Sequence, residues 1–336
     1  MDIAGLEMLA PDIELPHQPG EDKQWQESIV LGFADPEQEI GGFIRIGPQP
    51  NLKTVRSCFG VCSRNGTNYT RTAQGLPWQP SDTTQDSLSA DNFQSATFSG
   101  RKSRWRAADA NVDLDITVTD AHGPYDFWEF TNTDPAIRSA AAAMHLQAGG
   151  SFEGSIRIGD DGGKSISGFT YRDHSWGPRY VNDPNFDMYA TWWFVGSLGP
   201  DFTFGFGGGR WRSGVHSYFC YVVRDGEIDI MERVDDATFL MGTDGLSVRG
   251  GRMVVNSSKF GQLVFEAEGY GNVWLELGDK HFEMSTPCTI RCGNRVGGGL
   301  INTILNPRNG NDRPEFVESG KLDNGLYQSR NGMNVL

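Results

Sequence analysis

The chain has 336 residues, of which 38% are hydrophobic and 21% charged, and its formal net charge is −14. A chain of this length can bury one large or two smaller cores. So acidic a protein repels nucleic-acid phosphates and anionic lipid, and we expect neither as a partner. The sequence also lacks the run of about 18 apolar residues that a membrane-spanning helix needs.

The five cysteines form two C-x3-C pairs, Cys58 with Cys62 and Cys288 with Cys292, and leave Cys220 over. Residues four apart in a strand are separated by about 13 Å, which is too far for a disulfide. We therefore expect reduced, mostly buried thiols. The chain shows no metal-ligand spacing and no nucleotide-binding motif, so neither a metal nor another cofactor is expected. Its first residues lack the basic and apolar regions of a signal peptide, and we expect a cytoplasmic protein.

Taken in chain order, the predicted elements after an acidic, proline-rich start are almost all short strands. Residues 112–119 give the clearest pattern, because four aliphatic and four polar side chains alternate as in a half-exposed strand. Asp225-Gly226 is typical of a tight hairpin turn. Strand patterns recur at 28–33, 42–46, 55–62, 112–119, 125–130, 141–147, 154–158, 168–176, 187–198, 202–212, 215–224, 227–233, 253–256, 263–269, 273–277 and 286–291.

So many short strands predict an all-β protein, and they exceed what one barrel comfortably holds. We therefore expect two consecutive lipocalin-like domains, each an antiparallel β-barrel or sandwich. The expected organisation is an extended arm at 1–24, an N-terminal barrel at 25–180, a C-terminal barrel at 181–310 and a polar tail at 311–336.

One strand concentrates ionisable groups more than a half-buried strand normally does. Residues 171–179 read Y-R-D-H-S-W-G-P-R. In an extended strand Asp173 and His174 face opposite sides, so they reach one cavity only if a bulge intervenes. The two predicted faces carry Arg172, His174 and Trp176 on one side and Tyr171, Asp173 and Ser175 on the other.

These residue types suit proton transfer beside an apolar ligand. His174 has the side chain best suited to moving a proton near neutral pH, and Asp173 could fix its tautomer. Trp176 offers a flat surface to an apolar or cationic group. The alternative is a buried polar cluster that joins the two domains, with Asp173 paired to Arg172 or Arg179. The residues by themselves leave both interpretations open.

Three further residues are candidates for contact with a substrate. His145 and Gln147 share the polar side of an alternating stretch, which faces either a barrel lumen or solvent. Glu129 lies between two aromatic residues in a predicted strand, so it is either a lumen carboxylate or a solvent-facing one.

The run D-H-S-W-G-P-R, Asp173–Arg179, resembles a signature of the lipocalin-like superfamily that includes carotenoid 1,2-hydratase (hydroxyneurosporene synthase), kievitone hydratase, AttH-type proteins and Diels–Alderases. The resemblance implies two β-barrel halves and activity at a His-x-Trp unit, matched here by His174 and Trp176. It also implies an acid on the following Trp-rich strand, but this chain has Thr191 there and only Asp187 nearby. This departure argues against the carotenoid reaction.

The resulting hypothesis is a cofactor-independent lyase or isomerase that moves a proton at a double bond of an aromatic or terpenoid molecule. Hydration, dehydration, isomerisation and cyclisation all stay open, and so does the choice between a monomer and a homodimer. The alternative is a lipocalin-like carrier that binds a hydrophobic ligand without catalysis. His174 and Asp173 are the expected catalytic residues, and the expected substrate-binding residues are Trp176, Tyr171, Arg179, Tyr189, Trp192, His145, Gln147 and Glu129.

Overall fold

The computed structural model describes most of the chain, and every structural statement below concerns the part that it describes. Those residues are 8–133, 135, 138, 141–160, 162–180, 188–211, 216–242, 247–276, 282–305, 318–321 and 327–330.

Short 3-10 helices and many strands make up the described structure. The helices are η1 (Pro11–Glu14), η2 (Pro50–Leu52), η3 (Pro80–Asp82) and η4 (Phe127–Glu129). The strands of the first sheet are β1 (Trp25–Asp35), β2 (Ile40–Gln49), β3 (Thr54–Ser63), β4 (Asn68–Pro77), β5 (Ser87–Ala90), β6 (Gln94–Ser99), β7 (Lys102–Ala108), β8 (Val112–Asp126), β10 (Met144–Ile158) and β11 (Lys164–Pro178). The strands of the second are β9 (Thr131–Asn132), β12 (Met188–Ser197), β13 (Phe202–Trp211), β14 (His216–Arg224), β15 (Glu227–Ile230), β16 (Asp236–Met241), β17 (Val248–Ser257), β18 (Gly261–Gly269), β19 (Val273–Glu276), β20 (Phe282–Cys292), β21 (Arg295–Leu305), β22 (Glu318–Lys321) and β23 (Tyr327–Arg330).

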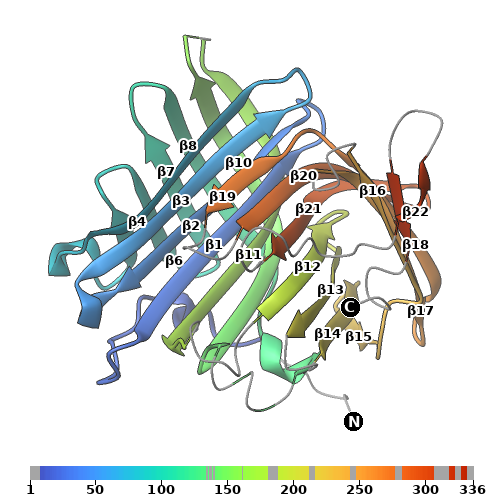
Figure 1. Cartoon of the computed structure of the whole chain (residues 1–336), viewed down its shortest axis with the longest axis horizontal. Coiled ribbons are helices and arrows are strands. Elements are labelled where there is room, and N and C mark those ends of the chain that lie inside the picture. The colour runs from blue at the N-terminus through green and yellow to red at the C-terminus, as the bar shows by residue number, and fades with distance from the viewer. Residues whose placement is uncertain are drawn as a thin grey trace.

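The strands form two large antiparallel sheets that lie side by side (Figure 1). The first is a nearly closed barrel, since its edge strand β5 returns against β2 and β3. The second is a half-barrel. The predicted all-β fold with two lipocalin-like halves is thus confirmed.

Both sheets are meanders in which most strands pair with their neighbours in sequence. The first has the order β4-β3-β2-β1-β11-β10-β8-β7-β6-β5, and the second centres on β14-β13-β12-β21-β20-β18. In each sheet an early strand pairs with a late one, β1 with β11 and β12 with β21. The predicted turn at Asp225-Gly226 joins β14 to β15, and both of its residues have positive φ, as a type I′ hairpin requires.

Strand alternation divides the apolar side chains among three cores. One fills the barrel around Trp105, and a second fills the half-barrel around Phe204 and Phe265. The third lies between the sheets and joins Phe43 of β2 to Leu300 of β21. The alternation predicted for 112–119 is confirmed, because every second side chain there is fully buried. All five cysteines are free and buried, as expected.

The chain does not divide cleanly into two halves. Strand β9 precedes β10 and β11 in sequence but pairs with β14 of the second sheet. The N-terminal arm carries η1 and places Glu14 in a buried position. Of the predicted tail at 311–336, the structure describes only β22 and β23, which extend the second sheet beside β16. The predicted domain limits themselves stay predictions.

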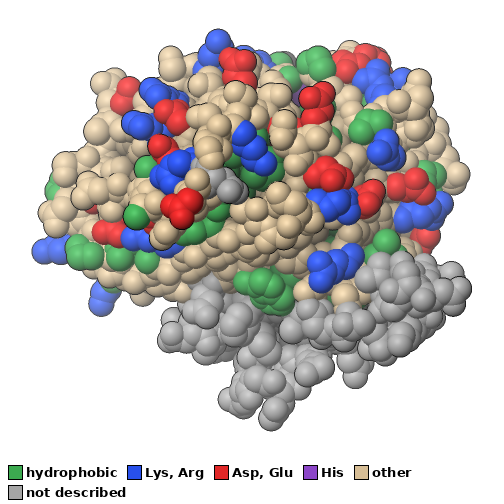
Figure 2. Space-filling view, turned by 90° about the horizontal axis from the view of Figure 1, so that it is seen from above, with side chains coloured by type: hydrophobic (Ala, Val, Ile, Leu, Met, Phe, Trp, Pro, Cys, Tyr) green, Lys and Arg blue, Asp and Glu red, His purple; other side chains and the backbone are tan. Residues whose placement is uncertain are grey.

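Figure 2 shows a face on which acidic and basic side chains are interspersed and the hydrophobic groups are small and separate. Among the described residues, no helix combines the length and the apolar character needed to cross a membrane.

Candidate functional site

Strand β11 carries the segment that the sequence singles out, and it presents two chemically different faces. It pairs with β1 and with β10, and no register shift interrupts either pairing around Asp173. Successive side chains therefore point to opposite sides. Asp173 and His174 therefore lie on opposite sides of the sheet. The sequence-based hypothesis assigned both to one catalytic site.

One face of β11 borders a cavity of about 160 Å³ between the outside of the barrel and the second sheet. Its walls come from β1, β2, β10, β11, β12, β20 and β21, so both sheets contribute. The lining residues are Ser28, Val30, Phe43, Arg45, His145, Tyr171, Asp173, Ser175, Arg179, Trp193, Val195, Glu283, Leu300, Asn302 and Ile304. Apolar walls with a few converging polar groups are typical of a site for a small molecule.

A histidine–aspartate pair stands in this cavity. The Nε2 atom of His145 forms a hydrogen bond with the Oδ2 atom of Asp173 on the neighbouring strand. The imidazole of His145 packs among aromatic rings, with ring centroids 4.4 Å from Phe127, 5.5 Å from Trp128 and 5.9 Å from Trp193. Packing and the carboxylate together fix the orientation of the ring, which is what a histidine needs to transfer protons.

The cavity also holds a buried carboxyl group, Glu283 of β20, that the sequence did not indicate. Burial raises the pKa of Glu283 from 4.5 to about 7, although the charge of Arg45 and a hydrogen bond from Asn302 act in the opposite direction. The Nδ2 atom of Asn302 donates this bond to Oε1 of Glu283. A carboxyl with such a pKa is present in both protonation states near neutral pH. Strand β20 has one other charged residue, Arg291, and nothing in its sequence singles out Glu283.

Two guanidinium groups supply positive charge to the same cavity. The Nε atom of Arg45 donates to Oγ of Ser28 at 3.1 Å, and Arg179 donates through Nη2 to Oγ of Ser175. The Nε atom of Arg179 is buried and has no hydrogen-bond partner among the described residues. Burial and the neighbouring charge of Arg45 lower the pKa of Arg179. Because they bring positive charge and an unused N–H donor to the cavity, Arg45 and Arg179 can bind an oxygen atom of a ligand. Tyr171 adds a donor, since burial holds its pKa well above the ordinary value and keeps it protonated.

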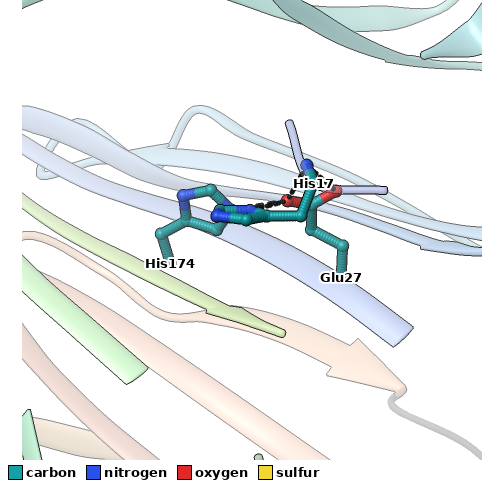
Figure 3. Close-up of side chains that lie close together, drawn as sticks. All are labelled: His17, Glu27 and His174. Carbon is teal, nitrogen blue, oxygen red and sulfur yellow. Dashed lines mark hydrogen bonds and ion pairs between the residues drawn. The ribbon is translucent and has the colours of Figure 1, made fainter. Parts of the chain in front are cut away.

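The other face of β11 points into the barrel, where His174 is part of a buried ionic cluster (Figure 3). Its Nδ1 atom lies 3.0 Å from Oε2 of Glu14, and its Nε2 atom lies 3.0 Å from Oε1 of Glu27. Burial lowers the pKa of His174, but these two carboxylates outweigh that effect and raise it to about 9. Arg172 completes the cluster by donating to Glu14 and, through two nitrogens, to Asp120.

The remaining predicted site residues lie outside the cavity. Trp176 is on the barrel side and stacks on His17 with centroids 3.6 Å apart, while Trp192 packs in the half-barrel core against Phe239. Gln147 is buried but does not line the cavity. Glu129 is exposed and belongs to η4, where the sequence predicted a strand. The side chain of Tyr189, like Asp187 as a whole, lies outside the described residues.

The geometry defines a class of protein: two lipocalin-like sheets with a small cavity between them that is lined by both polar and apolar side chains. The family model described as domain of unknown function (DUF7064) matches residues 10–307, and the chain belongs to that family. No curated protein matches the sequence.

Solved structures of the proteins that the D-H-S-W-G-P-R run resembles have the same fold as this chain. An AttH from Nitrosomonas europaea is 13% identical with a TM-score of 0.64, over 90% of this chain and 97% of that one. CghA with Sch210972 is 11% identical with a TM-score of 0.57, over 86% and 90%. Kievitone hydratase from Nectria haematococca is 12% identical with a TM-score of 0.53, over 89% and 96%.

Proposed function

We propose that this protein is a lyase or isomerase that moves a proton at a double bond of a small molecule held between the two sheets. One observation carries the proposal: Glu283, whose pKa is raised to about 7, lines the same cavity as the His145–Asp173 pair. A protonated acid and an oriented base in one apolar site are the two groups that such a reaction needs.

In hydration, the carboxyl of Glu283 gives its proton to one alkene carbon while water attacks the other. His145 accepts the proton that the water loses, and Asp173 stabilises the imidazolium that forms. His145 then releases its proton to solvent and Glu283 takes one up, so the net change is the addition of one water molecule. The reverse sequence eliminates water. Proton delivery by Glu283 and removal by His145 at different carbons, without water, isomerise the double bond. Attack by a second double bond on the protonated alkene closes a ring, and the cation that remains loses a proton to His145.

Other lining residues fit these steps. The indole of Trp193 offers an aromatic surface to a carbon that becomes cationic. Arg45 and Arg179 can hold a carbonyl, hydroxyl or carboxylate oxygen of the substrate. All of these groups belong to the chain, so the proposed reaction uses no cofactor. The names of two structural relatives, a hydratase and a protein solved with a small molecule, support a substrate of this class.

His174 has a different part in this proposal from the one that the sequence suggested. It makes no contact with the cavity, and both of its ring nitrogens are engaged by carboxylates inside the barrel. We assign it to holding the arm against the barrel. His174→Gln should then lower the free energy of unfolding. If His174 instead transferred the proton, His174→Gln would lose turnover while its stability stayed unchanged.

A carrier is the second candidate, and the apolar side chains of Val30, Phe43, Val195, Leu300 and Ile304 in the cavity wall favour it. A carrier binds the same molecules but releases them unchanged. The two functions therefore differ in product formation.

Turnover in heavy water tests the proposal. The chain is incubated in D2O with isoprenoid alkenes and with alkenes conjugated to a carbonyl, and mass spectrometry follows deuterium uptake and the gain or loss of water. We expect a product from the wild type and a decrease in kcat of about 10²- to 10⁴-fold in Glu283→Gln. Glu266→Gln changes an exposed carboxylate of β18 and should match the wild type. Binding without product favours the carrier, and full activity of Glu283→Gln excludes the assigned acid.

A further inference from the structure

Three residues from distant parts of the sequence meet inside the barrel. They are His17 of the N-terminal arm, Glu27 of β1 and His174 of β11 (Figure 3). One donor atom from each lies within 4.8 Å of the others. Sequence spacing could not reveal this set, because its members are separated by up to 157 positions, and the sequence accordingly predicted no metal.

Two imidazoles and one carboxylate are a ligand set that divalent transition metals use in proteins. The Oε1 atom of Glu27 lies 2.8 Å from Nδ1 of His17 and 3.0 Å from Nε2 of His174. Donor atoms about 2.1 Å from a tetrahedral ion are about 3.4 Å apart, so small rotations would make room for the ion.

A second carboxylate holds His174 in the orientation that a metal ligand requires. Glu14 accepts from Nδ1 of His174 at 3.0 Å, which leaves Nε2 directed at Glu27. Metal-bound histidines commonly donate their other ring nitrogen to a carboxylate in this way, which fixes the tautomer and increases the basicity of the ligand. Glu14 is itself anchored by Nη1 of Arg172 at 3.2 Å.

The charge around Glu27 also fits a cation. The Glu27 side chain is 1% exposed, and among the described residues no Lys or Arg lies within ion-pair distance of it. By contrast, Asp120 is neutralised by Arg172, with Arg101 also nearby. A buried carboxylate needs a counter-charge, and among the described residues only the imidazoles of His17 and His174 lie within ion-pair distance of Glu27. A divalent ion bound there would replace the proton that His174 holds on Nε2. His17 is 25% exposed, which gives an ion a route from solvent.

We propose that His17, Glu27 and His174 bind one divalent transition-metal ion of the zinc, cobalt or iron class. The ion fastens the N-terminal arm to β1 and β11, because one of its ligands comes from the arm. The site lies on the barrel side of β11 and shares no residue with the cavity between the sheets. It is therefore independent of the proposed reaction, and either proposal can fail without the other.

Metal titration of the full-length chain tests this site. Protein prepared without a histidine tag is stripped with a chelator and titrated with Co²⁺ and then Zn²⁺, by absorption spectroscopy and calorimetry. We expect one equivalent of Co²⁺ with visible bands of nitrogen and oxygen ligands, without thiolate charge transfer. Saturating Zn²⁺ should raise the Tm, because an ion that binds only the folded state stabilises it.

Two variants locate the ion. His17→Ala removes a partly exposed ligand from the arm, so it should fold, and we expect its affinity for Co²⁺ to fall at least about tenfold. The matched control Glu21→Gln changes an exposed carboxylate of the same arm and should bind like the wild type. Absence of a stoichiometric ion, a thiolate spectrum, or equal affinity in His17→Ala would each overturn the proposal.

Discussion

Among individual residues, Glu283 connects the proposed chemistry most directly with stability. Its side chain is 3% exposed, and burial raises its pKa to about 7. An ordinary carboxyl is ionised well below that pH, so the folded protein must either bind a proton or keep a poorly solvated charge. Strongly shifted pKa values concentrate at functional sites, and an acid that works near neutral pH needs the raised pKa.

We predict that Glu283→Gln stabilises the protein at alkaline pH. A carboxyl with a folded pKa of about 7 and an unfolded value of 4.5 destabilises the folded state progressively as pH rises from 4.5 through 7. At pH 8 the variant should exceed the wild type by up to about 3 kcal/mol in free energy of unfolding. The gain should shrink towards pH 4.5. Urea unfolding at both pH values measures it, with Glu266→Gln as the exposed control, and an equal gain at both would contradict the pKa.

The proposed acid also sets a pH dependence of activity. Glu283 must be protonated to donate, so kcat should decline as pH rises through about 7 and fall about tenfold for each further unit. Initial rates between pH 5.5 and 9 measure this limb, with far-UV circular dichroism at each pH to show that the chain stays folded. A rate that stays level across pH 7 would remove Glu283 from the acid role.

At the scale of elements, the regular alternation of β11 and the glycine near its end decide which side chains meet. Regular alternation gives β11 one face towards the cavity and one towards the barrel, so a single strand supplies two unrelated clusters. Gly177, the residue before the last of this strand, has a φ of 125°, and a Cβ there would lie 2.6 Å from the backbone nitrogen of Ala143. The positive φ and this close approach are the reasons why the D-H-S-W-G-P-R run has a glycine at position 177.

Packing of β3 on β19 is one of the contacts that join the two sheets, and Gly60 makes the close approach possible. A Cβ at Gly60 would lie 1.9 Å from Cγ1 of Val273, so the strands must move apart in Gly60→Ala. We expect a loss of about 1–3 kcal/mol, typical of overpacking. Gly162→Ala is the control, because nothing lies within 4 Å of its Cβ. Chemical denaturation compares the two, and equal stability would show that the interface gives way without cost.

At the scale of the whole molecule, the cavity exists because two curved sheets face each other. Its acid comes from β20 of the second sheet, and its histidine and aspartate come from β10 and β11 of the first. Neither half alone contains both proposed proton-transfer groups. The buried cluster of His17, Glu27 and His174 likewise needs the arm together with the barrel. Both sites therefore depend on contacts between segments far apart in the chain.

Local sequence patterns were enough to predict the fold class, one hairpin and the two faces of β11. The period of two along strands such as 112–119 predicted an all-β fold, the Asp-Gly turn predicted its hairpin, and the alternation in β11 predicted that Asp173 and His174 face opposite sides. These features depend on neighbours in sequence, because side-chain direction in a strand is set locally. The D-H-S-W-G-P-R run added a resemblance to proteins whose solved structures share this fold.

Only the tertiary structure decided which face of β11 meets a cavity and what joins it there. Period-two alternation separates faces but cannot say which one is hollow, so the sequence selected His174 and Trp176, while the cavity holds Asp173 with His145 and Glu283. Glu283 could not be found from its own strand, since its pKa comes from burial against another sheet. In the same way, the ligands around Glu27 come together only when the arm closes on the barrel, because segments far apart in sequence are juxtaposed by packing alone.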